Sequence, residues 1–304
     1  MRRAPQVSFL ADGRRLHLQD GPIDLIIEAS GNEADVRRAY SAAARRFTGL
    51  LDKLCDELPL LRQRANPAHC ALRGKVARRM HDAVRPFAAD CFITPMAAVA
   101  GAVAEEILSA ITDNSRLARA YVNNGGDIAL HLTGAEQFTV GLAERPDAPG
   151  LLQTMTIRAD DRTRGVATSG RHGRSFSLGI ADAVTVLAQT AAQADAAATI
   201  VANAVDLPGH PAIVRCPACD LQPDSDLGAL LVTRDVGELS GREIDDALGS
   251  GAASARKLLA AGLIEGAALR LQGDMIVVGP KKIEPFGFRA SLRAPLATEG
   301  AVHA

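Results

Sequence analysis

The sequence predicts an α+β protein with a mixed, mainly antiparallel sheet and packed helices. Short segments in which polar and apolar residues alternate, as in strands, are interleaved with longer segments of helical periodicity. These segments follow one another without the regular strand–helix–strand order that builds a parallel sheet. Hydrophobic residues make up 47% of the 304 residues, which is enough apolar material for a packed core. We expect a single domain over residues 1–304.

The first 90 residues are expected to form a hairpin followed by helices. Alternating segments at Gln6–Leu10 and Leu16–Ile27 flank an Ala-Asp-Gly turn signal and predict the hairpin. Ser30, with a glutamate three residues later, has the spacing of a capping box, so a helix should begin there and run to about residue 57. A second helix over about 71–86 ends at a proline, and its Arg and Lys side chains are expected to form a solvated face.

The core, residues 91–235, begins with a segment of small apolar residues from Thr94 that predicts a buried helix. An alanine-rich helix is expected over about 190–204. In residues 236–280, Ser240 and Glu243 form a second capping box that should open one more helix. Residues 281–304 are expected to be a tail. The predicted strands of these parts are 119–123, 127–132, 137–143, 151–158, 183–188, 229–233, 267–271 and 275–278.

Charge and composition argue against two classes of partner. The 34 basic residues stand against 35 acidic ones, so no basic surplus draws the chain to nucleic acid or anionic lipid. Aromatic residues, at 3%, are too few for base-stacking platforms or membrane belts. The long weakly polar run Ala183–Val205 contains an Asp and several amide side chains, so we interpret it as buried and not as a membrane span. No signal-peptide core follows the basic start, and the five cysteines are an odd set typical of reduced thiols, so we expect a cytoplasmic protein.

Two glycine-containing segments can approach a ligand with their backbone. Asn123-Asn124-Gly125-Gly126-Asp127 joins two predicted strands, and it is either a plain hairpin turn or a turn whose amides face a ligand. The second, residues 165–174, combines three glycines with Thr168, Ser169 and three basic side chains. It is either a phosphate cradle or an exposed polar loop, and it lacks the pattern of a Walker A loop.

Asp195 and Thr199 lie four residues apart in the alanine-rich helix, so their oxygens project from one face. Such a pair can hold Mg²⁺ while a phosphate supplies further ligands, or Asp195 is simply an acidic residue near a helix start. Cys216 and Cys219 form a single Cys-x-x-Cys pair, whereas a structural zinc site needs four ligands. Metal binding and redox activity are therefore both minor alternatives for these two cysteines.

In this order the segments resemble the ApbE-like superfamily of FAD:protein FMN transferases, and within it the uncharacterised protein family numbered 0280. The resemblance to the latter covers nearly the whole chain, and that to the transferases covers about residues 94–205. The matching segments are Thr94–Leu108, Val122–Ile128, Val166–Gly170, Gly179–Ala188, Ala194–Thr199 and Pro223–Gly228.

The resemblance implies a Mg²⁺-dependent enzyme that transfers FMN from FAD to a hydroxyl of a target flavoprotein and releases AMP. It makes Asp195 and Thr199 the expected metal ligands. It also implies a set of flavin-site residues: Asn123, Gly125, Gly126, Asp127, Thr168, Ser169 and Gly170.

The sequence departs from the transferases after Thr-Ser-Gly. Their His-x-x-Asp-Pro-x-Thr-Gly segment is absent, and residues 176–182 read Phe-Ser-Leu-Gly-Ile-Ala-Asp instead. His172 and Asp182 could partly replace it as a base and the group that orients the base. The alternative function is a flavin- or nucleotide-binding protein of the same fold that has no transferase activity or a different one.

Overall fold

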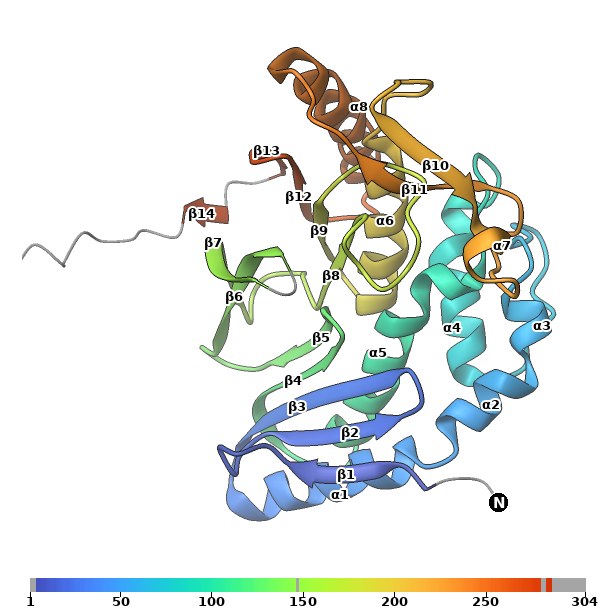
Figure 1. Cartoon of the computed structure of the whole chain (residues 1–304). Helices are drawn as coiled ribbons and strands as arrows, with labels where there is room; N and C mark the ends of the chain where they lie inside the picture. Colours follow the sequence, from blue (N-terminus) through green and yellow to red (C-terminus); the bar gives the residue numbers. More distant parts are fainter. Residues whose placement is uncertain (1–3, 146–147, 280–282, 286–304) are drawn as a thin grey trace, which may run out of the picture.

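A nine-stranded antiparallel sheet runs through the molecule, and helices cover one of its faces (Figure 1). The computed structural model describes residues 4–145, 148–279 and 283–285. Each neighbouring pair in this sheet is antiparallel. In spatial order the strands are β1 (Gln6–Phe9), β2 (Leu16–Asp20), β3 (Ile23–Gly31), β4 (Leu117–Asn124), β5 (Asp127–Leu132), β8 (Gly165–Ser169), β9 (Ala183–Ala188), β12 (Gly266–Leu271) and β13 (Asp274–Val278).

The helices on this face pack in the order of the strands beneath them. α5 lies on β4 and β5, α6 lies on β8 and β9, and α8 lies on β12 and β13. α1 and α4 in turn pack against α5. The main helices are α1 (Glu33–Phe47), α2 (Leu50–Asp56), α3 (Leu58–Leu61), α4 (Lys75–Val84), α5 (Val99–Thr112), α6 (Ala191–Ala204) and α8 (Gly241–Ala260), with a short turn η2 (Pro95–Ala98) before α5.

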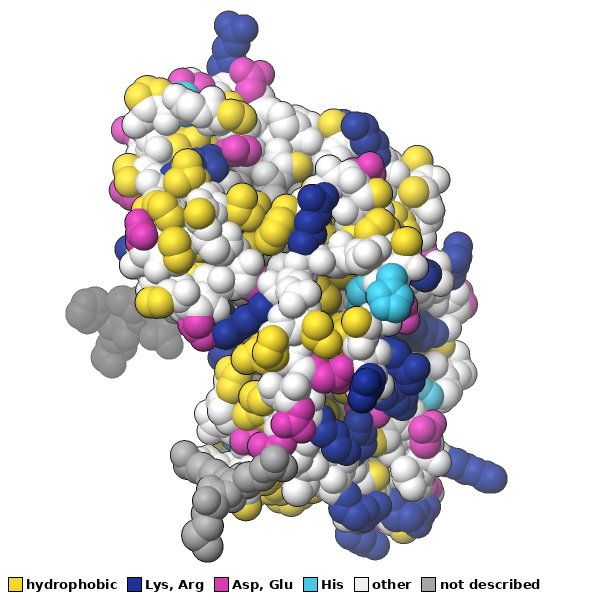
Figure 2. Space-filling model, turned by 90° about the vertical axis from the view of Figure 1, so that its right-hand side faces the viewer, with side chains coloured by type: hydrophobic (Ala, Val, Ile, Leu, Met, Phe, Trp, Pro, Cys, Tyr) yellow, Lys and Arg dark blue, Asp and Glu magenta, His cyan; other side chains and the backbone are white. Residues whose placement is uncertain are grey.

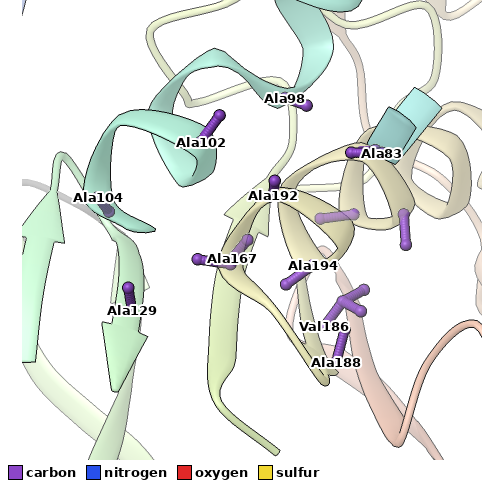
Figure 3. Close-up of a cluster of buried hydrophobic side chains, with 14 of the residues drawn as sticks. Ala83, Ala98, Ala102, Ala104, Ala129, Ala167, Val186, Ala188, Ala192 and Ala194 are labelled. Carbon is purple, nitrogen blue, oxygen red and sulfur yellow. The ribbon is translucent and has the colours of Figure 1, made fainter. Parts of the chain in front are cut away.

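Alanines line much of the seam between α5, α6 and the sheet (Figure 3). Ala102 and Ala104 from α5, Ala192 and Ala194 from α6, and Ala129 and Ala167 from the strands line it, and all are buried. Two glycines bring the backbones still closer: a Cβ on Gly101 would lie 2.3 Å from the Ala191 carbonyl oxygen, and one on Gly165 would lie 2.1 Å from that of Thr190. Any larger residue at these positions would push the start of α6 away.

The opposite face of the sheet carries a smaller sheet and a second core. β6 (Gln137–Arg145) and β7 (Ala148–Arg158) form a hairpin, with β14 (Ile283–Pro285) added to β7. Met155 and Ile157 of β7 pack there on side chains from β5, β8, β9 and β12. A separate ribbon of β10 (Ile213–Pro217) and β11 (Leu231–Val236), with the short α7 (Ala218–Leu221) between them, lies on the helix side.

The predicted α+β class with a mainly antiparallel sheet is confirmed, and several elements are corrected. Leu16–Ile27 is two strands with a turn at Gly21, and β3 continues through Gly31. The capping box at Ser30 is therefore wrong, because Asn32 caps α1 by accepting the Asp35 N–H. The predicted helix to about residue 57 is interrupted at Gly49, which has a positive φ of 71°. The prediction missed β8, β10 and β14.

Other predictions agree closely with the structure. β5 and β9 have the predicted bounds, and the capping box of Ser240 and Glu243 opens α8. Most of the predicted tail lies outside the described residues. Among the described residues, Pro95–Thr112 is long and apolar enough to cross a membrane by length and composition, yet half of it is buried, as in a core helix.

Candidate functional site

The strand register brings the glycine-containing segments to one end of the large sheet. Because Ile128 pairs with Val166, the Gly125–Gly126 turn lies beside Thr168 at the end of β8. Ser169 pairs with Val184, so β9 begins at this same end, directly after Asp182. The turn, the Thr-Ser-Gly segment and Asp182 are therefore neighbours although they are far apart in the sequence.

The Gly-Gly segment is a tight hairpin turn. Gly125 and Gly126 have positive φ values of 66° and 114°, and the Asn123 side chain accepts the Gly126 N–H at 2.8 Å. The guanidinium of Arg174 lies over the turn, with Nη1 3.6 Å from where a Cβ of Gly125 would be. The structure thus gives Asn123 a role within the turn and places a basic side chain above it.

Two carboxylates, Asp127 of β5 and Asp195 of α6, lie near enough for the charge of one to act on the other, and we call them the carboxylate pair. Asp127 opens β5 and alternates with the buried Ala129, so it faces the helices. Burial raises the pKa of Asp127 to about 7, against the effect of the Thr168 N–H. Burial and then the negative charge of Asp127 raise the pKa of Asp195 well above its ordinary value, whereas backbone N–H groups oppose the rise. Both side chains are partly buried.

Asp195 also caps the start of α5. Its Oδ2 accepts the Gly101 N–H at 3.0 Å, and the Ala100 N–H also binds this carboxylate. Both N–H groups belong to the first turn of α5, where no residue earlier in the helix can accept them. Asp195 therefore does have a structural task, which the sequence interpretation had not foreseen.

The hydroxyl residues divide between the two faces of the sheet. Thr199 lies one turn after Asp195 on α6, and Ser169 alternates with the buried Ala167, so Ser169 faces the helices as well. Thr168 faces the other way, and its hydroxyl is 2.8 Å from that of Thr185. Of the polar groups of Thr168, the backbone N–H is the one that points to the carboxylate pair, at 3.3 Å from Asp127 Oδ1.

His172 and Asp182, the predicted base and its orienting group, are in contact. His172 Nε2 lies 3.2 Å from Asp182 Oδ1, and Arg171 binds the same oxygen at 2.8 Å. The Gln272 N–H donates to the other oxygen. The backbone of Gly170 fits closely here, since a Cβ would lie 2.5 Å from the Asp182 carbonyl oxygen.

Residues 176–182, where the sequence departs from the pattern it resembles, are largely buried. Ser177 is 5% exposed, and Ile180 and Ala181 are fully buried. The Ser177 hydroxyl bonds the backbone of Gly179. These residues serve the core and leave few polar groups for a substrate.

Two other sequence features, the 223–228 loop and the Cys-x-x-Cys pair, show no sign of a ligand site among the described residues. In the 223–228 loop, Asp224 pairs with Arg62 at 2.8 Å, and Asp226 accepts the Thr94 hydroxyl. Cys216 and Cys219, like the other three cysteines, carry free thiols. Within the described residues, no three His, Cys, Asp or Glu side chains gather in a way that could hold a metal ion by themselves.

Sequence reasoning missed a second acidic centre, on α5, which we call the glutamate cluster: Glu105 and Glu106 with Arg46, Lys75 and Arg79. Arg79 binds Glu105 at 3.0 Å and Glu106 at 2.8 Å, so it is not part of a simply solvated face. Burial alone would raise the pKa of Glu106, but hydrogen bonds from the three cations hold this pKa below its ordinary value. Figure 2 views the side that carries α2, α3, α4 and α7, and shows Lys and Arg side chains gathered in its lower half. The repeated basic residues in the sequence were a signal for a charged cluster, but the sequence did not indicate which acidic side chains they pair with.

The chain is similar to one protein family model and to several curated proteins. The family model described as AbpE bacteria matches residues 7–277. A UPF0280 protein of Methanopyrus kandleri is 39% identical over 133 residues, covering 42% of this chain and 48% of the relative. Those of Methanococcus vannielii and Archaeoglobus fulgidus are 40% and 34% identical, over 41% and 46% of this chain and 50% and 54% of the relatives. The matches thus span about half the length of these curated relatives.

Proposed function

Because the chain belongs to the AbpE bacteria family, we propose that it is an ApbE-like protein that binds Mg²⁺ and a flavin nucleotide at the end of its large sheet. Its proposed activity is that of an FAD:protein FMN transferase or a related flavin-using enzyme. The observation that carries the proposal is the carboxylate pair: two neighbouring, partly buried acids that form no ion pair with any described cation and whose pKa values are both raised.

The residues present fit a magnesium ion. Among the described residues, no ion pair involves Asp127 or Asp195, so their charges repel each other in a poorly solvated place. Mg²⁺ prefers carboxylate and hydroxyl oxygens and completes its shell with water and phosphate. Asp127, Asp195 and Thr199 would hold the ion, and the ligand's phosphates would supply oxygens that the protein lacks.

The other residues of this end of the sheet suit a phosphate substrate. When bound, Mg²⁺ would neutralise charge on the phosphates of FAD. Arg174, above the Gly125 turn, offers a cation to the same phosphates. The hydroxyl oxygen of the target protein attacks the FMN phosphorus, and the bond to the AMP oxygen breaks. His172 takes the hydroxyl proton at Nδ1, because its Nε2 faces Asp182.

A second candidate is a flavin- or nucleotide-binding protein that transfers nothing. The observation that favours it is the burial of Ser177, Ile180 and Ala181, where the transferases carry a substrate-positioning segment. In this case the carboxylate pair and the turn bind ligand, and His172 has no chemical task.

One experiment separates the two candidates. The purified chain is incubated with FAD, Mg²⁺ and a candidate flavoprotein, and AMP release and a flavin-sized mass increase are measured. Transfer predicts both signals and their loss in His172→Gln. A thermal-shift series with FAD, FMN and AMP runs beside it, since a ligand at a hundred times its Kd stabilises by about 2.7 kcal/mol. Stabilisation without AMP release supports the binding protein, and no stabilisation by any of the three contradicts both.

A further inference from the structure

The starts of α5 and α6 cap one another. Asp195 of α6 accepts the Gly101 N–H of α5 at 3.0 Å, and Glu105 of α5 accepts the Ala192 N–H of α6 at 2.7 Å. Each carboxylate thus accepts an N–H from the first turn of the other helix, where the N–H groups have no acceptor within their own helix. The two hydrogen bonds join the helices on either side of the close contact between Gly101 and Ala191.

The alanine seam does little to set how far α6 slides along α5. Methyl groups form shallow ridges, so alanine-lined helices pack closely without the interlocking that long side chains provide. Directional hydrogen bonds then decide the register. Ala192 and Asp195 lie three residues apart on α6, so a shift at Ala192 moves the Asp195 carboxylate with it.

Glu105 is itself held in place. Its other oxygen, Oε2, lies 3.0 Å from Arg79 Nε, and the Arg79 guanidinium also donates to the Ala102 carbonyl oxygen at 3.3 Å. The Glu105 side chain is 17% exposed, so it has little freedom to turn to solvent. A continuous chain of contacts therefore leads from α4 through Glu105 to the start of α6.

We infer that Glu105 is a positioning residue of the cation site. By binding the Ala192 N–H, it holds α6 in the register that sets Asp195 against the start of α5 and beside Asp127. This inference rests on the proposed function, in which the carboxylate pair binds Mg²⁺. Glu105 does not contact the ion, and its effect passes through Asp195.

Glu106 provides a matched control. It is the next residue on α5, it is 4% exposed, and it binds Arg79 as Glu105 does. Its other ion-pair partners among the described residues are Arg46 and Lys75, from α1 and the start of α4, and none of these ion pairs involves α6. Removing its charge disturbs the same cation network without touching the Ala192 N–H.

The test compares Glu105→Ala, Glu105→Gln and Glu106→Gln in the full chain. Mg²⁺ affinity is measured by calorimetry, and amide exchange at Gly101 and Ala192 is measured in EDTA. We expect Glu105→Ala to weaken Mg²⁺ binding about tenfold or more, as loss of an outer partner of a metal ligand does. Exchange at both amides should quicken about tenfold or more, because the hydrogen bonds that protect them open.

Rescue and control decide between positioning and general damage. Glu105→Gln keeps an oxygen for the Ala192 N–H and should recover most of the affinity. Glu106→Gln should lower the unfolding midpoint while Mg²⁺ affinity stays within about twofold. Equal affinity losses in Glu105→Ala and Glu106→Gln, or no rescue by Gln, would overturn the inference. If the unmodified chain binds no Mg²⁺, the proposed function fails, and unchanged exchange at Gly101 in Glu105→Ala would then refute the positioning role separately.

Discussion

Two pairs of acidic side chains flank the contact between α5 and α6, and the chain treats them in opposite ways. Glu105 and Glu106 are met by three cations, and the pKa of Glu106 lies below its ordinary value. Asp127 and Asp195 receive only backbone N–H groups among the described residues, and both of their pKa values are raised. The two sites have similar acids, but their counter-charges differ.

The difference separates scaffold from site. In the glutamate cluster the protein supplies its own counter-ions, so the charges stabilise the packing of α1, α4 and α5 permanently. At the carboxylate pair the negative charge lacks such partners, which is costly unless a proton or a cation from solution compensates it. A place where the fold tolerates this cost is a candidate binding site.

The largest expected effect comes from removing one charge of the carboxylate pair. Asp195→Asn keeps the size of the side chain and an oxygen for the Gly101 N–H, but it removes the negative charge that attracts the cation. Mg²⁺ affinity should fall by about a hundredfold or more, beyond the loss typical of outer partners. The midpoint of unfolding without metal should hold or rise, because a repulsion is relieved. Calorimetry and urea unfolding on the same preparation measure both, and unchanged Mg²⁺ affinity would return Asp195 to a purely capping role.

The same change in the glutamate cluster should give the opposite pattern. Glu106→Gln leaves Arg46, Lys75 and Arg79 without their shared carboxylate, so the free energy of unfolding should fall by about 1–3 kcal/mol. FAD binding should not change, because none of these contacts reaches the end of the sheet. A stability loss with weaker FAD binding in the folded variant would show that Glu106, and not Glu105 alone, is coupled to the carboxylate pair.

The pH dependence of stability should differ in sign between the two sites. The pKa of Asp127 rises from an ordinary 3.8 to about 7, so the folded state keeps a proton that the unfolded state releases. Stability in EDTA should therefore fall as pH rises from about 4 to about 7. Glu106, whose pKa is lowered, contributes stability above its ordinary pKa of 4.5 and loses it as pH falls further. Urea unfolding against pH checks this, and Asp127→Asn should flatten the fall above pH 5.

The smallest expected effect concerns Arg174. This exposed side chain lies over Gly125 and belongs to neither acidic site. Arg174→Ala should weaken binding of FAD by about two- to fivefold, the size expected of an exposed charge. Mg²⁺ affinity measured without nucleotide should be unaltered. Salt dependence sharpens the test, since the difference between the two proteins should shrink at high ionic strength.

The sequence predicted local structure well where local signals decide it. β9 and the start of α8 follow from alternation and from a capping box, and both were found. The capping box at Ser30 failed because pairing with β4 extends β3 past it, and such long-range pairing overrides a local motif. β8 was missed because its five residues lie among glycines and resemble a loop.

The site was predictable as a set of residues but not as an arrangement. Motifs pointed to Asp127 and Asp195 separately, and the resemblance assigned them to different ligands. Their proximity depends on the register of β5 against β8 and on how α6 packs on the sheet, which no short pattern encodes. Glu105 was missed for the same reason, since its partner Ala192 lies on another helix.

The central claim is that the carboxylate pair takes a cation from solution in place of a proton. Calorimetric titration of Mg²⁺ at pH 6, in buffers of different ionisation enthalpy, counts the protons released on binding. Because the pKa of Asp127 is raised to about 7 and that of Asp195 is raised as well, we predict release of at least about one proton per Mg²⁺ at pH 6 and fewer at pH 8.5. Binding with no proton release at pH 6, or no Mg²⁺ binding at either pH, would contradict the account.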